Sequence, residues 1–521
     1  MPFVDPYDKE TAVRLLDFFG SGSPWQRRLW SSGVVLTLKE VLEASQAMRQ
    51  GVLSSETFGD LTAYAAKLAG LDPGIGGPQI KQTLQHALKK SMVPDGADYS
   101  TVDLILKSTE TKYLSNVRAE IAAGQKPKIE RLARCIASRL LDSGYSAERL
   151  HRWCTLHMRN ASGAQNLAEL LEDAQNLSIR PLETYKILVA FHRVPPNLSG
   201  MPENWLSAED SSKWLRANGI STTDIRLRGS MLFHVTGRDV WAALQAAVEN
   251  VEQLRSRVAL GAANPLKPTG QAWVEGETST FSFRPEDRRV EVHALHRNNK
   301  LYAAGTNSIV DAALELLGSL RSGPASSAVA GGWASIEAVL KGPGDSGVLA
   351  ADRMASLVAC SFVRAELTQL SYRIEELGGT MAAKLAACAT NRDRAAAVAD
   401  AIQQGTSFSL SGDSDRAALA RMAQVVNNSS TALSDIQSHV SVALRRLYRI
   451  RNLVMHGGKT NAVGLAANLR TAAPLVGAGM DRIAHAWFVE NIGPMELAAR
   501  AAVRLATVGL PTAHGPVDLL S

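Results

Sequence analysis

Apolar residues recur at helical spacing through the first part of the chain. The stretch VLTLKEVLEASQAMRQG keeps its apolar positions near a 3.6-residue period and stops at Gly51, as a helix does. The stretch KIERLARCIASRLLDSGYSAERLHRWCTL predicts two helices joined at 142–144, with Ser146 capping the second one. We therefore expect residues 1–220 to form an N-terminal helical domain, with the proline-rich segment 193–205 as a connector.

The pattern changes near residue 221. The stretch DIRLRGSMLFHVTG alternates between apolar and polar residues, which predicts a strand through Ile225, Leu227, Met231, Phe233 and Val235. A helix from Arg238 to about Leu260 should follow, and then the short β-like runs QAWVEG, STFSFRP, RRVEVHALHR and KLYAAG. This pattern predicts a small α/β domain over 221–325. The small residues of LRSGPASSAVAGG, 320–332, predict a linker after it.

Helical periodicity returns in the last part of the chain, 326–521. We expect helices over Trp333–Leu340, Leu349–Leu377, 391–404, 416–456, 461–487 and 493–507. The fold class is therefore mainly α, with an N-terminal helical domain, a small central α/β domain and a C-terminal helical bundle. Three domains also suit a chain of 521 residues.

The expected helix 416–456 carries a charge inside its apolar face. That face is formed by Leu433, Ile436, Val440, Leu444, Leu447 and Val454. At about 100° per residue, Arg451 falls in the middle of the same face. Burying an unpaired charge costs several kcal/mol, so Arg451 requires a partner or a wet interface. Glu337 and Glu366, on neighbouring helices, are the acids we expect to examine first.

The end of this helix gathers polar residues on a second face. Arg445, Arg449, Asn452 and His456 lie within about 60° of one another, and Gly457-Gly458 then ends the helix. Basic residues in a last turn also stabilise the helix dipole, and this purely structural interpretation stays open. A phosphate-binding loop ending in Gly458-Lys459-Thr460 is excluded, because Leu453 stands where that loop needs its first glycine.

The segment RNLVMH, 451–456, resembles the Arg-polar-x-x-x-His signature of HEPN-domain ribonucleases, whose helical bundle is similar to the one expected here. The resemblance implies a metal-independent endoribonuclease with Arg451, Asn452 and His456 as catalytic residues and no cofactor. RNA would be cut by attack of the 2′-hydroxyl, leaving a 2′,3′-cyclic phosphate. Cations that would contact the RNA are Arg445, Arg449 and Lys459.

The same resemblance implies a homodimer through the C-terminal bundle and a bacterial antiphage or toxin effector. The preceding domains would then sense a phage-derived or protein trigger, by analogy alone. The alternative is a non-catalytic helical scaffold that binds RNA or protein and dimerises through the same bundle. Arg451 distinguishes the ribonuclease from the scaffold, because a scaffold gains nothing from a charge in the apolar face of a helix.

Composition limits the partners and the cellular compartment that we expect for the protein. The formal net charge of +6 permits an RNA partner without requiring one. Four cysteines lie far apart in helical patterns, which favours reduced thiols in the cytosol. No apolar run reaches the roughly 18 residues of a membrane span, and the N-terminus has no secretory pattern. We expect a cytoplasmic protein without a membrane partner.

Overall fold

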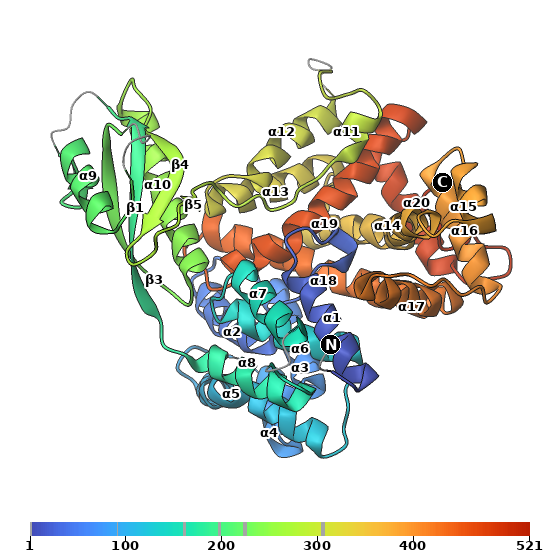
Figure 1. Ribbon diagram of the computed structural model, residues 1–521. Helices are drawn as coiled ribbons and strands as arrows, with labels where there is room; N and C mark the ends of the chain where they lie inside the picture. The colour runs from blue at the N-terminus through green and yellow to red at the C-terminus, as the bar shows by residue number, and fades with distance from the viewer. Residues whose placement is uncertain (1–2, 91, 160–162, 196–199, 222–226, 304–307) are drawn as a thin grey trace.

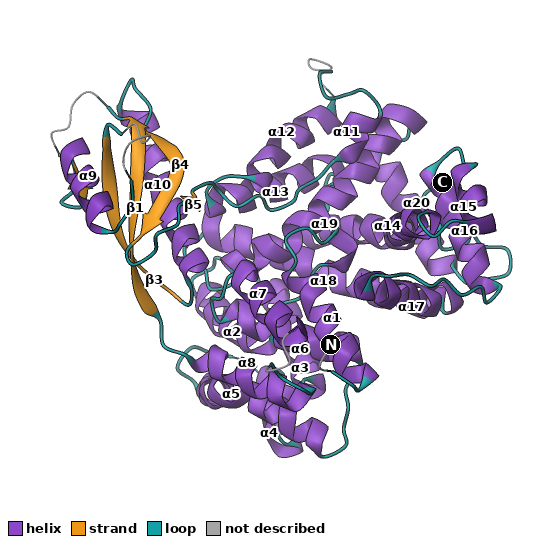
Figure 2. Ribbon diagram, in the orientation of Figure 1, coloured by secondary structure: helices purple, strands orange, loops and turns teal. Residues whose placement is uncertain are grey.

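The computed structural model describes residues 3–90, 92–159, 163–195, 200–221, 227–303 and 308–521. Within these ranges twenty α-helices dominate, helix makes up 65% of the structure, and a small antiparallel sheet of five strands lies in the middle of the chain. Figures 1 and 2 show the sheet and its two helices set to one side of a larger helical body. The expected mainly helical fold class is confirmed.

The N-terminal region is helical up to residue 179. Its helices are α1 Pro6–Phe19, α2 Val34–Arg49, α3 Ser55–Leu71, α4 Pro78–Leu88, α5 Ala97–Ala122, α6 Ile129–Asp142, α7 Ala147–Arg159 and α8 Leu167–Ile179. The helix expected to end at Gly51 is α2. The predicted cap is also present, because the Ser146 hydroxyl accepts a hydrogen bond from the Arg149 amide at 3.1 Å.

The sheet has the strand order β2-β3-β1-β4-β5, and every pair is antiparallel. Its strands are β1 Glu183–Arg193, β2 Trp205–Leu206, β3 Gly229–Gly237, β4 Lys267–Val274 and β5 Phe281–Ser282. Successive side chains of the central strand β1 point to opposite faces of the sheet. Ile187 and Val189 pack toward the helix α10, Val240–Gly261, and Leu188 packs toward the helix α9, Ala208–Ala217. Each face of the sheet thus has its own small core.

The expected boundaries of the α/β domain require correction. The strand β1, the strand β2 and the helix α9 all precede residue 221, within the segment assigned to the helical domain and its connector. Residues 187–191 of β1 are buried on both faces of the sheet, so this apolar run, ILVAF, lacks the switching between apolar and polar residues that marks a half-exposed strand. The strands β3 and β4 and the helix α10 are as expected, whereas Ile225 lies outside the described residues.

The end of that expected domain belongs to the helical body. The run RRVEVHALHR forms no strand: its second half is the short helix α11, His293–Arg297, and the described part of KLYAAG, 300–303, is not a strand either. The helix α12, Ile309–Arg321, follows. Val290 and the α12 residues Val310 and Leu317 are buried in the helical core, which holds this segment away from the sheet.

The C-terminal helices are α13 Ala325–Leu340, α14 Gly347–Glu375, α15 Gly379–Ala386, α16 Asn391–Gln403, α17 Asp413–Asn427, α18 Ser429–Met455, α19 Leu465–His485 and α20 Pro494–Thr507, with a π-helical turn at Ala486–Glu490. The prediction of a linker over 320–332 is wrong, because the helix α13 occupies most of this segment. Its small residues let α12 approach closely: a Cβ on Gly331 would lie 2.7 Å from the Leu316 carbonyl oxygen. The single helix expected over 416–456 is divided at Asn428.

The two ends of the chain share one core. Buried side chains from α1 to α8 and from α12 to α20 form a single apolar cluster, and α1 packs on α17. The N-terminal helices are therefore packed directly on the C-terminal bundle. Within the described ranges, none of the helices combines the length and apolar character that crossing a membrane requires.

Candidate active site at the end of helix α18

Helix α18 runs antiparallel to α14 and beside α13. Gln437 donates to the Ser356 hydroxyl at 2.9 Å, and one turn later Ser441 donates to Asp352 at 2.5 Å. Tyr448 packs on Trp333 of α13, with ring centroids 5.0 Å apart. These contacts place the last turn of α18 next to α13, and they bury the apolar face that the sequence predicts.

Arg451 lies where that face meets α13 and reaches three polar groups. Its Nη1 donates to Asn452 Oδ1 at 3.0 Å and lies 3.3 Å from His456 Nε2. Its Nη2 lies 3.5 Å from Glu337 Oε2. On a straight helix, residues five apart diverge by about 140°, so the contact with His456 depends on the length of the arginine side chain and on the end of the helix. The structure thus brings Arg451, Asn452, His456 and Glu337 together.

His456 is the residue at which α18 ends. Its side chain is exposed, and its backbone amide donates to the Asn452 carbonyl oxygen at 2.9 Å. A guanidinium has only donors, so Nε2 must be the acceptor in the contact with Arg451. A hydrogen bond in this arrangement requires the tautomer that carries its proton on Nδ1. A basic nitrogen accordingly lies beside a fixed positive charge and close to solvent.

Two glycines shape the chain beyond His456. Gly458 has a φ of +65°, the left-handed conformation that glycine adopts without strain. A Cβ on Gly457 would lie 2.7 Å from the Leu453 carbonyl oxygen and 3.1 Å from a methyl group of Val52. Since Val52 follows α2, the end of α18 is packed against the N-terminal helices.

Arg449, expected to contact RNA, is buried instead. Its Nη2 donates to Glu40 Oε2 at 2.8 Å, and Nε of the fully buried Arg446 donates to the same oxygen at 3.0 Å. Burial lowers the pKa of both guanidinium groups and Glu40 raises it. The pKa of Arg446 is raised overall, whereas that of Arg449 is lowered overall. Because Arg449 is buried and its charge is compensated by Glu40, it is not available to contact RNA as expected.

Two other expected RNA contacts lie nearer the surface. Arg445 is about a third exposed and forms ion pairs with Asp352 at 2.7 Å and with Asp60 of α3 at 3.0 Å. Lys459 is half-buried, and its charge is among the influences that lower the pKa of Glu43, although burial raises that pKa overall. Arg445 is thus compensated by two carboxylates, whereas Lys459 is only half-buried and stays a candidate for contact with RNA.

Glu366, the second expected partner of Arg451, is engaged elsewhere. Its carboxylate lies 2.7 Å from Nη2 of Arg27, and both side chains are nearly fully buried. Glu337 is therefore the carboxylate next to Arg451, and it also binds Lys341 at 2.9 Å.

Sequence reasoning did not find the pairing of Arg446 with Glu40. The signal was that Glu40 stands one helical turn after Leu36 and one turn before Ala44, on an apolar line of its helix, where a carboxylate requires a buried cation. The identity of that cation was not accessible, because the two residues are far apart in the chain. In the described part of the chain, no cluster of His, Cys, Asp or Glu side chains has the arrangement of a metal site.

Comparison with known proteins finds no matching family model, no matching curated protein and no matching solved structure.

Proposed function

We propose that the protein is a metal-independent endoribonuclease whose catalytic residues are Arg451 and His456, as its resemblance to HEPN-domain ribonucleases implies. One observation carries the proposal: a guanidinium nitrogen lies 3.3 Å from an exposed imidazole nitrogen at the end of a helix. A general base and a donor for phosphate oxygens are the two groups that this cleavage reaction requires.

In the proposed reaction, Nε2 of His456 takes the proton from a ribose 2′-hydroxyl. The 2′-oxygen attacks the adjacent phosphorus and the bond to the 5′-oxygen breaks. That oxygen takes a proton from water and leaves as a 5′-hydroxyl, and His456 later returns its proton to solvent. The other product is a 2′,3′-cyclic phosphate. Once protonated, Nε2 no longer accepts from Arg451, and the N–H group of Nη1 that faced it can donate to a phosphate oxygen. Asn452 keeps Arg451 oriented through its side-chain oxygen.

The surroundings of the motif support a restrained effector. Ion pairs and close packing from α2 and α3 hold the last turns of α18, through Glu40, Val52 and Asp60. A trigger that shifts these helices would change the geometry at Arg451 and His456. We extend the proposal to a bacterial antiphage or toxin effector that works in the cytoplasm as a homodimer, with a phage-derived or protein trigger.

A non-catalytic scaffold is the second candidate, and one observation favours it. Arg445 and Arg449, two of the three cations expected to contact RNA, are neutralised by carboxylates within the chain. A helix end with so little free positive charge also suits a surface that binds protein.

The test is incubation of the purified full chain with a generic RNA in EDTA. We expect cleavage by the wild type and products that polynucleotide kinase labels at the 5′ end without prior phosphatase treatment. His456→Ala should abolish cleavage, whereas His514→Ala, which changes another exposed histidine, should leave it intact. Truncating an exposed side chain costs little stability, so both variants should fold. If His456→Ala cleaves as fast as His514→Ala, the catalytic assignment is wrong.

A further inference from the structure

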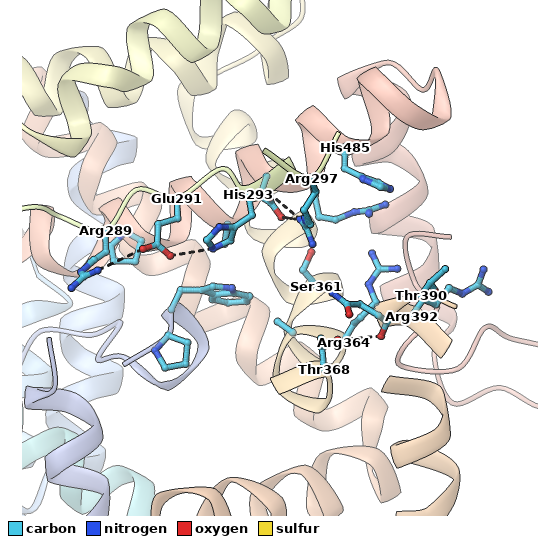
Figure 3. Close-up of a pocket in the computed structure, with 18 of the residues that line it drawn as sticks. Arg289, Glu291, His293, Arg297, Ser361, Arg364, Thr368, Thr390, Arg392 and His485 are labelled. Atoms are coloured by element: carbon cyan, nitrogen blue, oxygen red, sulfur yellow. Dashed lines mark hydrogen bonds and ion pairs between the residues drawn. The ribbon is translucent and has the colours of Figure 1, made fainter. Parts of the chain in front are cut away.

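A cavity of about 1050 Å³ lies on the helical body and has no lining residue from α18. Its walls come from the turn at 21–25, the segment around α11, the middle of α14, the loop before α16 and the helix α19 (Figure 3). This volume is at the upper end of what small-molecule sites enclose. The cavity is therefore a site separate from the one proposed for RNA cleavage.

The lining carries more positive than negative charge. Six arginines face three carboxylates: Arg28, Arg289, Arg297, Arg364, Arg392 and Arg482 against Glu291, Asp481 and Glu490. Four of the six are compensated. Arg297 binds Asp481 at 2.9 Å and Arg392 binds Asp518 at 2.6 Å, whereas Arg482 lies 3.3 Å from Glu490 and Arg289 lies 3.8 Å from Glu291. The histidine His485 adds no full charge near neutral pH, because burial and Arg482 lower its pKa. The excess positive charge therefore lies on Arg28, which donates only to backbone carbonyl oxygens, and on Arg364.

Among the arginines of the cavity, Arg364 most clearly lacks a counter-ion. It projects from α14 into the cavity in Figure 3, and in the described part of the chain it has no hydrogen bond and no ion pair. Burial first, and then the charges of Arg482 and Arg392, lower the pKa of Arg364 to about 10, so it still carries its charge at neutral pH. A half-buried cation without a counter-ion is unfavourable, and a bound anion would reduce that cost.

Two more donors in the lining lack acceptors. Nε of Arg482 and Nδ2 of Asn298 are buried and have no hydrogen-bond partner, although Nη2 of Arg482 donates to the Leu520 carbonyl oxygen at 2.8 Å. Buried donors are nearly always satisfied in native proteins. Together with Arg364 they call for a ligand that has many acceptor oxygens.

We propose that this cavity binds a small molecule carrying a polyphosphate group. Phosphate oxygens match the planar forks of Arg364 and Arg482 better than a single carboxylate does. The cavity is also much larger than one inorganic phosphate ion. Trp25, held by Trp30 at 6.1 Å between ring centroids, lines the same cavity and offers an aromatic surface to a ligand that has a base. The proposal does not depend on RNA cleavage at Arg451.

Isothermal titration of the full chain at fixed salt, with inorganic triphosphate and with ATP as probes, tests the proposal. We expect at least one probe to bind, and Arg364→Gln to weaken its binding about tenfold or more. The matched control is Arg373→Gln, which changes an exposed arginine on the same helix outside the cavity and should bind as the wild type does. Equal binding of both probes would assign the affinity to phosphate alone, and tighter binding of ATP would add the base as a determinant.

The proposal is overturned if neither probe binds at millimolar concentration, or if Arg364→Gln and Arg373→Gln weaken binding equally. Should Arg364→Gln fail to fold, Arg392→Gln gives the same comparison, because Arg392 lines the cavity from a half-exposed position at the surface. Unchanged binding by Arg392→Gln would in that case count against the proposal.

Discussion

Arg451 occupies a place on α18 where a leucine would pack. Its side chain is about a quarter exposed, and its contact with Glu337 at 3.5 Å is long for an ion pair. Such a pair contributes at most about 1 kcal/mol to stability. Stability therefore gives little reason to keep the charge at this position, whereas the proximity of His456 gives a chemical one.

For Arg451→Leu we expect a melting temperature equal to or above that of the wild type and loss of RNA cleavage by a factor of about 100 or more. Leucine completes the apolar face, and Glu337 keeps Lys341 as its partner. The developing charge on the phosphate loses its donor. Thermal unfolding and cleavage rates in EDTA measure the two effects. A variant that is stable and fully active would leave the scaffold as the better interpretation.

Asp72 is a second residue whose environment has a measurable consequence. It is buried, and it accepts hydrogen bonds from the Gly74 amide at 2.8 Å and the Tyr113 hydroxyl at 2.9 Å. Burial raises its pKa from 3.8 to about 6 against the opposing effect of these hydrogen bonds. The folded state then binds a proton between pH 3.8 and 6 that the unfolded state has lost, so stability falls as the pH rises through this window.

Asp72→Asn should remove this dependence. Wild-type stability should drop by up to about 3 kcal/mol more than that of the variant between pH 4 and pH 7, because each pKa unit is worth about 1.4 kcal/mol. Asparagine keeps an acceptor oxygen for the Gly74 amide. Urea unfolding of both proteins at several pH values gives the difference directly. Parallel pH profiles would show that Asp72 titrates normally.

At the scale of elements, α2 holds α18 through one carboxylate. Glu40 compensates the two buried guanidinium groups of Arg446 and Arg449, whereas Glu43, one turn later, accepts from the Val463 amide at 3.2 Å. Removing one partner of a buried ion pair typically costs about 3–5 kcal/mol. The attachment of α2 to the end of α18 therefore depends on Glu40 far more than on Glu43.

We expect Glu40→Gln to lower the free energy of unfolding by about 3–5 kcal/mol, because two buried cations lose their counter-charge. Glu43→Gln is the matched control on the same helix. Its amide oxygen can still accept from Val463, so the cost should stay within about 1 kcal/mol. Denaturant unfolding compares the two variants, and equal losses would contradict the role given to Glu40.

Helix periodicity predicted several helices individually, among them α2, α6, α7, α10, α14, α16, α19 and α20. Periodicity failed where contacts between distant elements determine the local structure. Strand β1 has two buried faces and no alternation, and the small residues of α13 indicated a linker although they serve close helix packing. At the site, the pattern pointed to Arg451 and Glu337. It could not show that Arg449 turns inward, because Glu40 comes from a distant helix.

At the scale of the whole molecule, the shared core makes the N-terminal helices part of the support for α18. The surface around the motif nevertheless includes apolar side chains without cover: Met455 is 57% exposed and Val463 is 45% exposed. Both flank the turn that carries His456 and the two glycines. An isologous contact between two copies would cover them and bring two Arg451–His456 pairs to one groove.

We therefore expect the protein to sediment at twice the chain mass at micromolar concentration. Met455→Asp should shift it to a monomer, because a carboxylate placed in an apolar contact must be desolvated without a partner. The shared groove predicts that this monomer loses RNA cleavage as well. Leu260→Asp, which changes an exposed leucine at the end of α10 in the sheet region, should remain dimeric and active. A wild-type monomer that cleaves RNA would refute the shared groove, and a dimer that Met455→Asp leaves unchanged would place the contact elsewhere on the surface.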